Sequence, residues 1–234
     1  MPKQIKENAL FIADAHYPHH GDEFLKLLQD LESGKVKTPQ LFLMGDIFDL
    51  LFGYNEYIKT FSQELITLLQ KLSTFIEIHY LEGNHDFSIK EIFPNINVYS
   101  REEQPVEFQL KDKIFHLAHG DLYETGFGYN LYCKIIRNKT TLTLLRPFEK
   151  IIIDNRIGKL KQKDICGDFV KYIERFEKIS RHYPSNSTVV EGHFHQGVVH
   201  QNYISLPSLA CQGEVGVIIE DELIFKELKS IYTP

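Results

Sequence analysis

The sequence has few cysteines, and their spacing is uninformative. Its 234 residues include only Cys133, Cys166 and Cys211, at intervals that match neither a zinc ligand set nor a disulfide framework. An odd and sparse cysteine count is typical of a reducing compartment. We therefore expect a cytoplasmic protein in which any metal site uses ligands other than thiolates.

Long apolar runs are also missing. No window holds the 18 or more consecutive apolar residues that a membrane-spanning helix needs. The apolar stretch near the N-terminus is brief and runs into Asp14, so we interpret it as a core strand and not as a signal peptide. A soluble protein is the expectation, with a peripheral membrane contact left open.

Positive charge is not in excess. The chain has 26 Lys or Arg against 32 Asp or Glu, a formal net charge of −6, which gives no bulk attraction to nucleic acid. We expect no nucleic-acid partner. The length and the 43% hydrophobic content are typical of a single domain over residues 1–234 that can carry an inserted segment.

The first part of the chain alternates between two apolar patterns. Apolar runs at 9–13, 40–44 and 75–81 predict buried strands, and residues 22–33 and 56–73 carry apolar groups at helical spacing. This alternation predicts a parallel sheet that is covered on both faces. Ligands of such sheets gather beyond the carboxyl ends of the strands.

The second part reads mainly as β-structure. Short strands are predicted at 97–100, 106–110, 113–118 and 187–191, with more in the tail after residue 197. Together the two parts predict an α/β fold, specifically an α+β sandwich. We expect two mixed β-sheets packed face to face, flanked by helices, with a helical cap insertion at residues 122–183.

The predicted insertion is strongly basic in its middle. From Lys134 to Lys163 there are nine Lys or Arg against two acidic residues, a local charge of +7. One interpretation is a solvated helical hairpin with a basic outer face. The alternative is a cap whose cations meet an anionic substrate. The apolar residues of the insertion fit either core packing or contact with an apolar ligand.

The chain contains five polar motifs, and four of them directly follow predicted apolar strands. They are Asp14-Ala15-His16, Gly45-Asp46-Ile47-Phe48-Asp49, Gly83-Asn84-His85-Asp86, His119-Gly120-Asp121 and Gly192-His193-Phe194-His195. Taken singly, each motif is a weak signal, because a histidine at a strand end is more often a surface or hydrogen-bonded residue than a ligand. Five in this order predict one shared site. The remaining histidines keep the ordinary structural interpretation: His19, His20, His79, His116, His182 and His200.

The side chains of these motifs suit a pair of divalent ions. Imidazole with carboxyl or amide oxygens suits Mn²⁺, Fe or Zn²⁺. Asp14 and His16 are spaced to approach one ion, and His193 and His195 have the same spacing, so that one histidine can face each ion. Asp46 follows a glycine that permits a tight turn, which suits a bridging ligand.

Asn84 and His119 complete the predicted ligand set. Asn84 is a neutral ligand, and its neighbours Gly83 and His85 are not core residues, so core packing does not explain the motif. His119 precedes Gly120. Asp49 and Asp86 are expected to orient the ligands and catalytic groups from behind.

The five motifs, from Asp14 through His195, resemble those of the calcineurin-like metallophosphoesterases. The resemblance implies a β-sandwich flanked by helices and a dinuclear centre, with Mn²⁺ the favoured metal, that hydrolyses phosphate esters or anhydrides. It implies a first ion held by Asp14, His16 and His195, a second held by Asn84, His119 and His193, and a bridge from Asp46. It also implies that His85 assists the substrate phosphate or the leaving group.

Within that family the chain is similar to the UDP-2,3-diacylglucosamine pyrophosphatases of lipid A synthesis. The similarity lies in chain length, in the segment after His119-Gly120-Asp121, and in the helical insertion. It implies hydrolysis to UMP and 2,3-diacylglucosamine 1-phosphate beneath a lid, and a peripheral contact with the inner face of the membrane through residues 122–183. The candidate substrate contacts are Tyr129, Tyr132, Arg137 and Lys163.

Two alternatives to this substrate stay open. The best-known members of the subfamily carry Arg where this chain has His85, so another metallophosphoesterase is one alternative: a phosphodiesterase, a nucleotidase or a protein phosphatase. The other is a non-catalytic scaffold, against which the intact ligand set argues. A diacyl substrate needs a hydrophobic slot beneath residues 122–183, whereas a small nucleotide leaves such a slot empty. No feature of the sequence indicates an oligomeric state.

Overall fold

The computed structural model describes residues 3–123, 126–167 and 171–232. One mixed sheet has the order β14-β13-β2-β3-β5-β7. Its strands β2, β3, β5 and β7 are parallel, and β13 and β14 add an antiparallel edge. The bounds are β2 (Leu10–Ile12), β3 (Gln40–Leu43), β5 (Glu77–Leu81), β7 (Asn97–Tyr99), β13 (Glu214–Ile219) and β14 (Glu222–Glu227).

The second mixed sheet has the order β1-β8-β9-β10-β12-β11. Its central strands β9, β10 and β12 are parallel to one another, so their carboxyl ends lie at one edge. The bounds are β1 (Lys3–Gln4), β8 (Val106–Leu110), β9 (Lys113–Ala118), β10 (Ser187–Glu191), β11 (Val198–His200) and β12 (Tyr203–Ser205). A small parallel pair joins β4 (Leu51–Phe52) to β6 (Asp86–Phe87).

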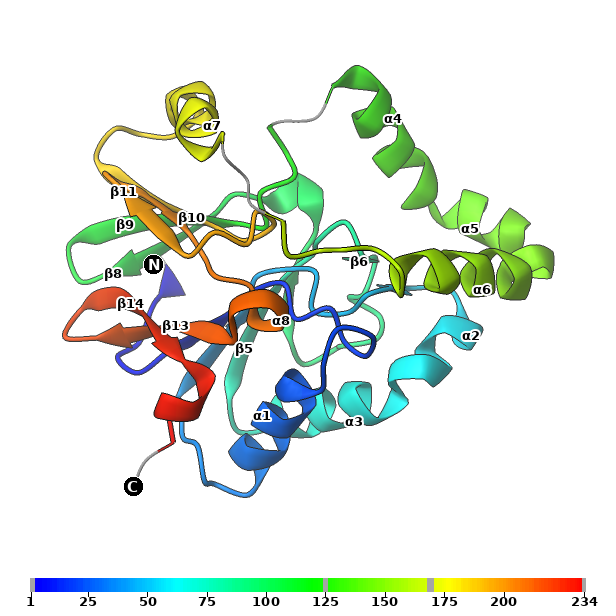
Figure 1. Cartoon of the computed structure of the whole chain (residues 1–234), viewed down its shortest axis with the longest axis horizontal. Coiled ribbons are helices and arrows are strands. Elements are labelled where there is room, and N and C mark those ends of the chain that lie inside the picture. Colours follow the sequence, from blue (N-terminus) through cyan, green and yellow to red (C-terminus); the bar gives the residue numbers. More distant parts are fainter. Residues whose placement is uncertain (1–2, 124–125, 168–170, 233–234) are drawn as a thin grey trace.

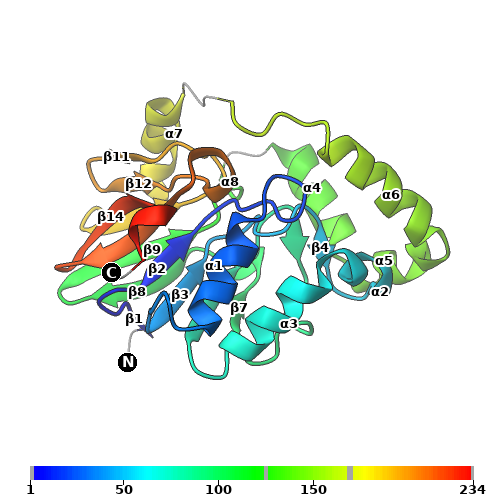
Figure 2. The same cartoon turned by 60° about the horizontal axis from the view of Figure 1, so that its bottom comes forward.

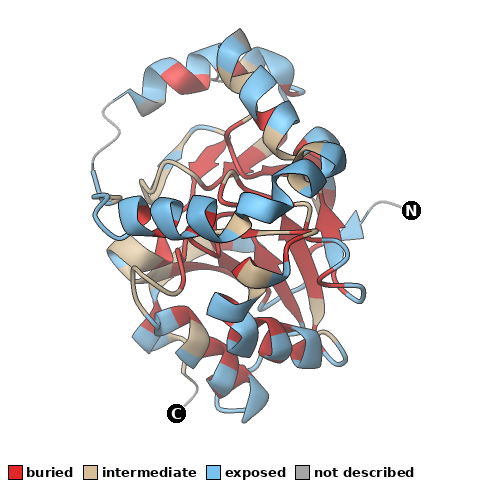
Figure 3. Cartoon of the chain, turned by 90° about the vertical axis from the view of Figure 1, so that its right-hand side faces the viewer, coloured by how far each residue is buried: buried red, intermediate tan, exposed pale blue. Residues whose placement is uncertain are grey.

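The two sheets pack face to face, as the sequence predicts. Side chains alternate along each strand, so Phe11 and Phe42 belong to the apolar layer shared with Phe108 of the other sheet. Leu10 and Leu41 point the opposite way, into a second apolar layer. Helices α1 (Glu23–Glu32) and α3 (Gln63–Leu72) cover that layer. Burial is accordingly concentrated in and around the sheets (Figure 3).

The helix predicted over residues 56–73 is broken. It consists of α2 (Glu56–Lys59), a 3₁₀ turn over Thr60–Ser62, and α3. The Thr60 hydroxyl donates to the carbonyl of Tyr57 at 2.7 Å, the kind of local side-chain bond that competes with helix geometry. The strand predicted from residue 75 begins at Glu77, and Phe75 is exposed.

The insertion predicted at 122–183 is mainly helical where the structure describes it, apart from residues 161–167, and its helices lie in two places. Helices α4 (Phe127–Ile136), α5 (Lys139–Leu145) and α6 (Glu149–Leu160) form an arm beside α2, whereas α7 (Tyr172–Ile179) lies over the second sheet (Figures 1 and 2). The arm is docked by Ile153, which joins the α1/α3 core, and by a hydrogen bond from Asn55 to Glu149. No helix in the described ranges has the length and apolarity to cross a bilayer.

The cysteine spacing, which matches no disulfide framework, did not predict a bond that the structure contains. A disulfide joins Cys166, between α6 and α7, to Cys211 in α8 (Leu209–Gln212), across 45 positions of sequence. The tertiary fold brings these two residues together, and their spacing in the sequence does not indicate that they are close. Cys133 is free and buried in α4.

Candidate metal-binding site

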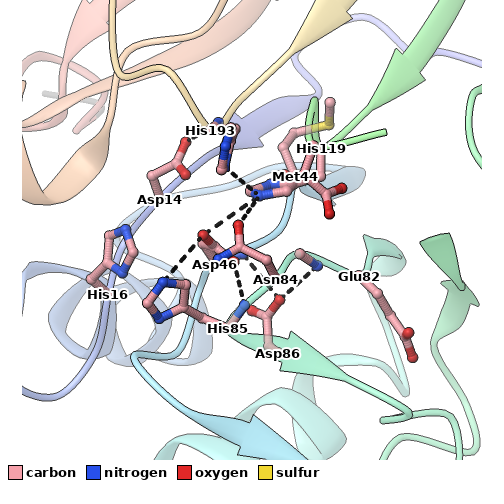
Figure 4. Close-up of polar contacts among 12 residues, drawn as sticks. Asp14, His16, Met44, Asp46, Glu82, Asn84, His85, Asp86, His119 and His193 are labelled. Carbon is pink, nitrogen blue, oxygen red and sulfur yellow. Dashed lines mark hydrogen bonds and ion pairs between the residues drawn. The ribbon is translucent and has the colours of Figure 1, made fainter. Parts of the chain in front are cut away.

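The five polar motifs meet at one edge of the sandwich. The turns after β2, β3 and β5 bring Asp14, Asp46 and Asn84 to the carboxyl edge of the first sheet. The turns after β9 and β10 bring His119 and His193 to the corresponding edge of the second sheet. Figure 4 shows these side chains pointing toward one another. Parallel pairing in each sheet therefore creates the site.

Asp14, His16 and His195 form a first group of potential ligands. One ligand atom from each lies within 4.8 Å of the others. Asp14 Oδ2 accepts the backbone N–H of His193, whereas the buried Oδ1 has no hydrogen-bond partner among the described residues and lies 3.3 Å from His195 Nε2. Burial opposes ionisation of Asp14, but His195 outweighs it and lowers the carboxyl pKa. A buried anionic oxygen without a donor fits a cation.

Asp46, His119 and His193 form a second group with the same close spacing. The Nδ1–H of His119 donates to the carbonyl of Met44 at 3.0 Å, which leaves Nε2 facing the site. That nitrogen lies 3.5 Å from Asp46 Oδ2, 3.3 Å from Asn84 Oδ1 and 3.1 Å from His193 Nδ1. Without a proton or a metal ion between them, these nitrogen and oxygen atoms would direct lone pairs at one another. The arrangement therefore suits one cation at this point.

The pKa shifts of the second group reflect this convergence. Burial opposes a charge on His119, but the carboxylate of Asp46 prevails and raises the His119 pKa to about 10. Burial and the charge of His119 lower the pKa of His193 to about 4. Asp46 is also buried, yet His119, His85 and then His16 hold its pKa well below the usual range. Charges from both ligand groups thus act on Asp46.

The backbone at the site is unusual. Five candidate ligands that are not glycine have left-handed φ angles between 46° and 62°. Such conformations cost about 1–3 kcal/mol each and cluster at functional sites. The five residues are Asp14, His16, Asp46, His193 and His195.

Two glycines allow the turns to approach one another. Gly45 has φ +87°, and a Cβ there would clash with the His119 ring. A Cβ on Gly83 would clash with the side chain and backbone of Asp46. Both positions therefore require glycine for close approach to a candidate ligand.

Asp86 holds the turns after β3 and β5 in place. Its Oδ1 accepts the backbone N–H groups of Asp46 and Gly83 at 3.0 and 2.8 Å. Its Oδ2 accepts the N–H of Ile47 at 2.7 Å and the hydroxyl of Tyr80 at 2.6 Å. The fully buried carboxylate thus sets the backbone that carries Asp46 and Asn84.

Asp49 has a comparable position behind the first group. Its Oδ1 lies 3.6 Å from both His16 Nδ1 and His20 Nε2. Its Oδ2 accepts the backbone N–H of His19 at 2.9 Å and contacts the His19 ring at 2.8 Å. His19 and His20 were not predicted at the site, although they follow Asp14-Ala15-His16 in the same loop. That adjacency was the available signal.

His85 presents one ring nitrogen to the site. Its Nδ1–H donates to the carbonyl of Asp49 at 2.7 Å, and Nε2 lies 4.0 Å from Asp46 Oδ2. Burial lowers the pKa of His85 despite the neighbouring Asp46, which favours a neutral ring. Its Nε2 can therefore accept a proton or contact a polar ligand.

An open cavity of about 370 Å³ lies over the candidate ligands. Lys163, predicted as a substrate contact, lines it together with other residues of the segment between α6 and α7. The full lining is His16, Asp46, Asn84, His85, Lys163, Asp164, Ile165, Gly167, His193, Phe194 and His195.

The other predicted substrate contacts do not line this cavity. Arg137 instead donates from Nη2 to the carbonyl of Gly83 at 2.7 Å and lies over the Phe87 ring. Tyr132 is half exposed on α4, and Tyr129 is partly buried beside it. Arg137 therefore links α4 to the turn that carries Asn84.

A sandwich of two mixed sheets with two Asp/His groups at one edge defines a metal-dependent hydrolase of the dinuclear type. The sequence model of the calcineurin-like phosphoesterases matches residues 8–197. The chain belongs to the calcineurin-like phosphoesterase family, whose members bind two divalent metal ions.

Relatives were also found by direct comparison. A UDP-2,3-diacylglucosamine hydrolase of Histophilus somni strain 129Pt is 26% identical over 214 residues, which cover 84% of this chain and 87% of that protein. A protein of the same name from Porphyromonas gingivalis is 28% identical over 128 residues, 50% and 47% of the two chains. The solved E. coli phosphoesterase Yfce aligns with a TM-score of 0.46 and 14% identity, over 94% of this chain and 99% of that one.

Replacing Asp86 with Asn tests its role as the support of the two turns. The amide nitrogen of Asn cannot accept a hydrogen bond, so Asp86→Asn should lower the free energy of unfolding by about 3 kcal/mol, measured by urea denaturation. Asp112→Asn, in an exposed turn, should change it by no more than about 0.5 kcal/mol. Equal stability of the two variants would contradict this role.

Proposed function

We propose that the chain hydrolyses UDP-2,3-diacylglucosamine to UMP and 2,3-diacylglucosamine 1-phosphate with two Mn²⁺ ions. The convergence of the two ligand groups beneath a cavity that contains Lys163 carries the reaction class. The names of the relatives support the substrate. Mn²⁺ suits ligands made of imidazole, carboxylate and amide oxygen, as Fe and Zn²⁺ also do.

The proposed roles of the residues follow from their positions. Two divalent cations in such a site polarise phosphoryl oxygens and make water a stronger nucleophile. Asp46 is the proposed bridge, because histidines of both groups act on its charge. The first cation would be held by Asp14, His16 and His195, and the second by Asn84, His119 and His193.

Three further residues are proposed to act on the substrate or on the ligands. His85 presents Nε2 toward the cavity and would contact the substrate phosphate or the leaving group. The ammonium group of Lys163 would attract the anionic diphosphate. Asp49 would orient His16 through His16 Nδ1, which lies 3.6 Å from Asp49 Oδ1.

The apolar surface of the arm supports a lipid substrate. Leu144, Phe148 and Ile151 are 72%, 59% and 65% exposed, in the stretch where Lys and Arg outnumber acidic residues by nine to two. An apolar crevice beneath the arm, bordered by Phe52 and Leu145, holds only about 50 Å³. This crevice is too small for an acyl chain and does not provide the hydrophobic slot expected for a diacyl substrate. The exposed apolar face of the arm is the surface proposed to meet the chains instead.

The alternative function is hydrolysis of a smaller phosphodiester. It is favoured by the polar character of the cavity and by His85, where the best-known diacylglucosamine pyrophosphatases carry Arg. Nothing beyond the shared metal site favours a nucleotidase or a protein phosphatase over a phosphodiesterase.

An activity panel separates the two functions. The Mn²⁺-loaded protein should hydrolyse UDP-2,3-diacylglucosamine with a kcat/KM about 100-fold or more above those for bis-p-nitrophenyl phosphate and a cyclic nucleotide. UMP release is the measurement. Turnover of the small diesters with none of the lipid would refute the lipid substrate and favour the alternative function.

Removal of the Asp46 charge tests the metal centre. Asp46→Asn keeps an acceptor for the N–H of His85, which Asp46 Oδ1 binds at 2.8 Å, but it lacks the charge that a bridge between two cations needs. Metal content, measured by plasma emission spectroscopy, and turnover of bis-p-nitrophenyl phosphate should fall together. Asp112→Asn serves as the matched control. Two metals per chain and near-normal turnover in Asp46→Asn would exclude the bridging role.

We also propose that the protein is cytoplasmic and contacts the inner face of the membrane through the arm. Phe148 on the arm and Phe75 far from it are both 59% exposed, which makes them a matched pair. Phe148→Ser should weaken co-sedimentation with phosphatidylglycerol-containing vesicles about tenfold, from the lost burial of one aromatic side chain. Phe75→Ser should bind as wild type does. Equal binding by the two variants would count against the arm as the contact.

A further inference from the structure

Residues 161–167, which directly follow α6, lie over the candidate metal site and belong to no helix or strand. We define the strap as residues 161–167. Its residues are exposed except for Ile165, which is partly buried, yet Lys163, Asp164, Ile165 and Gly167 line the cavity. The strap therefore needs a firm attachment to hold Lys163 at the site.

One attachment of the strap is a hydrogen bond to a candidate ligand. The carbonyl of Ile165 accepts the Nδ1–H of His195 at 2.8 Å. Because a carbonyl only accepts, Nδ1 carries a proton, and Nε2 is the nitrogen that faces Asp14. A carbonyl behind a ligating histidine fixes both the tautomer and the ring orientation. The strap backbone thus orients His195.

The other attachment is covalent. Cys166 of the strap is bonded to Cys211 of α8, whose sulfur lies 3.7 Å from His195 Nδ1. Helix α8 is itself tied to the first ligand group. The backbone N–H groups of Leu209 and Ala210 donate to the carbonyls of Ala13 and Asp14, and the buried Ser208 hydroxyl also donates to the Asp14 carbonyl. The disulfide therefore connects the strap to a platform built on Asp14.

We propose that the Cys166–Cys211 disulfide is a positioning device for His195 and Lys163, and that its reduction loosens the first metal site and the substrate pocket. The inference rests on the proposed metal ligands. A dithiol reductant supplies two electrons and two protons, the S–S bond breaks, two cysteine thiols form, and the reductant becomes a disulfide. Cys166 is exposed, so a reductant can reach it. In a reducing compartment the bridge then links the activity to the thiol balance.

The test compares three forms of the full-length protein. These are the oxidised wild type, the wild type reduced with dithiothreitol and then desalted, and the Cys166→Ser/Cys211→Ser double variant. After denaturation, the oxidised chain should show one free thiol, that of Cys133, and the reduced chain three. The reduced wild type carries no substitution, so the comparison stands even where the double variant folds poorly.

Binding of Mn²⁺ is the main measurement. In the reduced protein and in the double variant, one of the two ions should bind about tenfold more weakly, the effect typical of losing support behind a metal ligand. The other ion should bind as in the oxidised protein. The KM for bis-p-nitrophenyl phosphate should rise, and kcat at saturating Mn²⁺ should change little. Reoxidation of the wild type should restore both values, and Cys133→Ala should keep the full redox response.

Three results would overturn the proposal. The first is three free thiols in a chain treated with oxidised glutathione, which would mean that the bridge does not form. The second is unchanged Mn²⁺ binding and KM after reduction. The third is that reduction weakens the binding of both Mn²⁺ ions equally, which would show that the disulfide stabilises the protein as a whole and does not position His195. A failure of the lipid substrate would appear only in the activity panel and would leave the thiol count and the Mn²⁺ comparison intact.

Discussion

The buried carboxylate of Asp86 is the interaction on which the site depends. It binds backbone donors from the turn after β3 and from the turn after β5, together with the Tyr80 hydroxyl. These bonds set the distance between Asp46 and Asn84 before any ligand arrives. Because an unmatched buried carboxylate is costly, the two turns and the carboxylate stabilise one another. The last motif is joined to the first in a similar way, by the bond from the His193 N–H to Asp14.

The rest of the sandwich provides the free energy that this arrangement requires. Five candidate ligands hold left-handed backbone conformations, each of which costs about 1–3 kcal/mol. Two apolar layers, one between the sheets and one beneath α1 and α3, are fully buried and offset that cost. The ligand-bearing turns can therefore adopt strained geometry at the rim of a well-packed core.

In the proposed function, the chemistry and the specificity lie on different parts of the chain. The candidate ligands come from turns of the sandwich, whereas Lys163 and the exposed apolar residues come from the insertion. Links from the insertion to the site include Arg137 on the Gly83 carbonyl, Arg175 on the Gly120 carbonyl, Ile165 on His195, and the Cys166–Cys211 bond. On this proposal, changes in the insertion alter the substrate while the turns that carry the candidate ligands stay the same.

The sequence by itself determined the strands, the order of the motifs and the family, because apolar runs and the polar residues that end them are local patterns. It also indicated Asp14, Asp46 and Asn84 as neighbours, since parallel strands bring their carboxyl ends together. Only the tertiary structure decided the partners of His19, His20 and Arg137, the division of the insertion between two faces, and the pairing of Cys166 with Cys211. These contacts join segments that are distant in sequence or side chains whose direction no local pattern specifies, so they follow from how the sheets and helices pack.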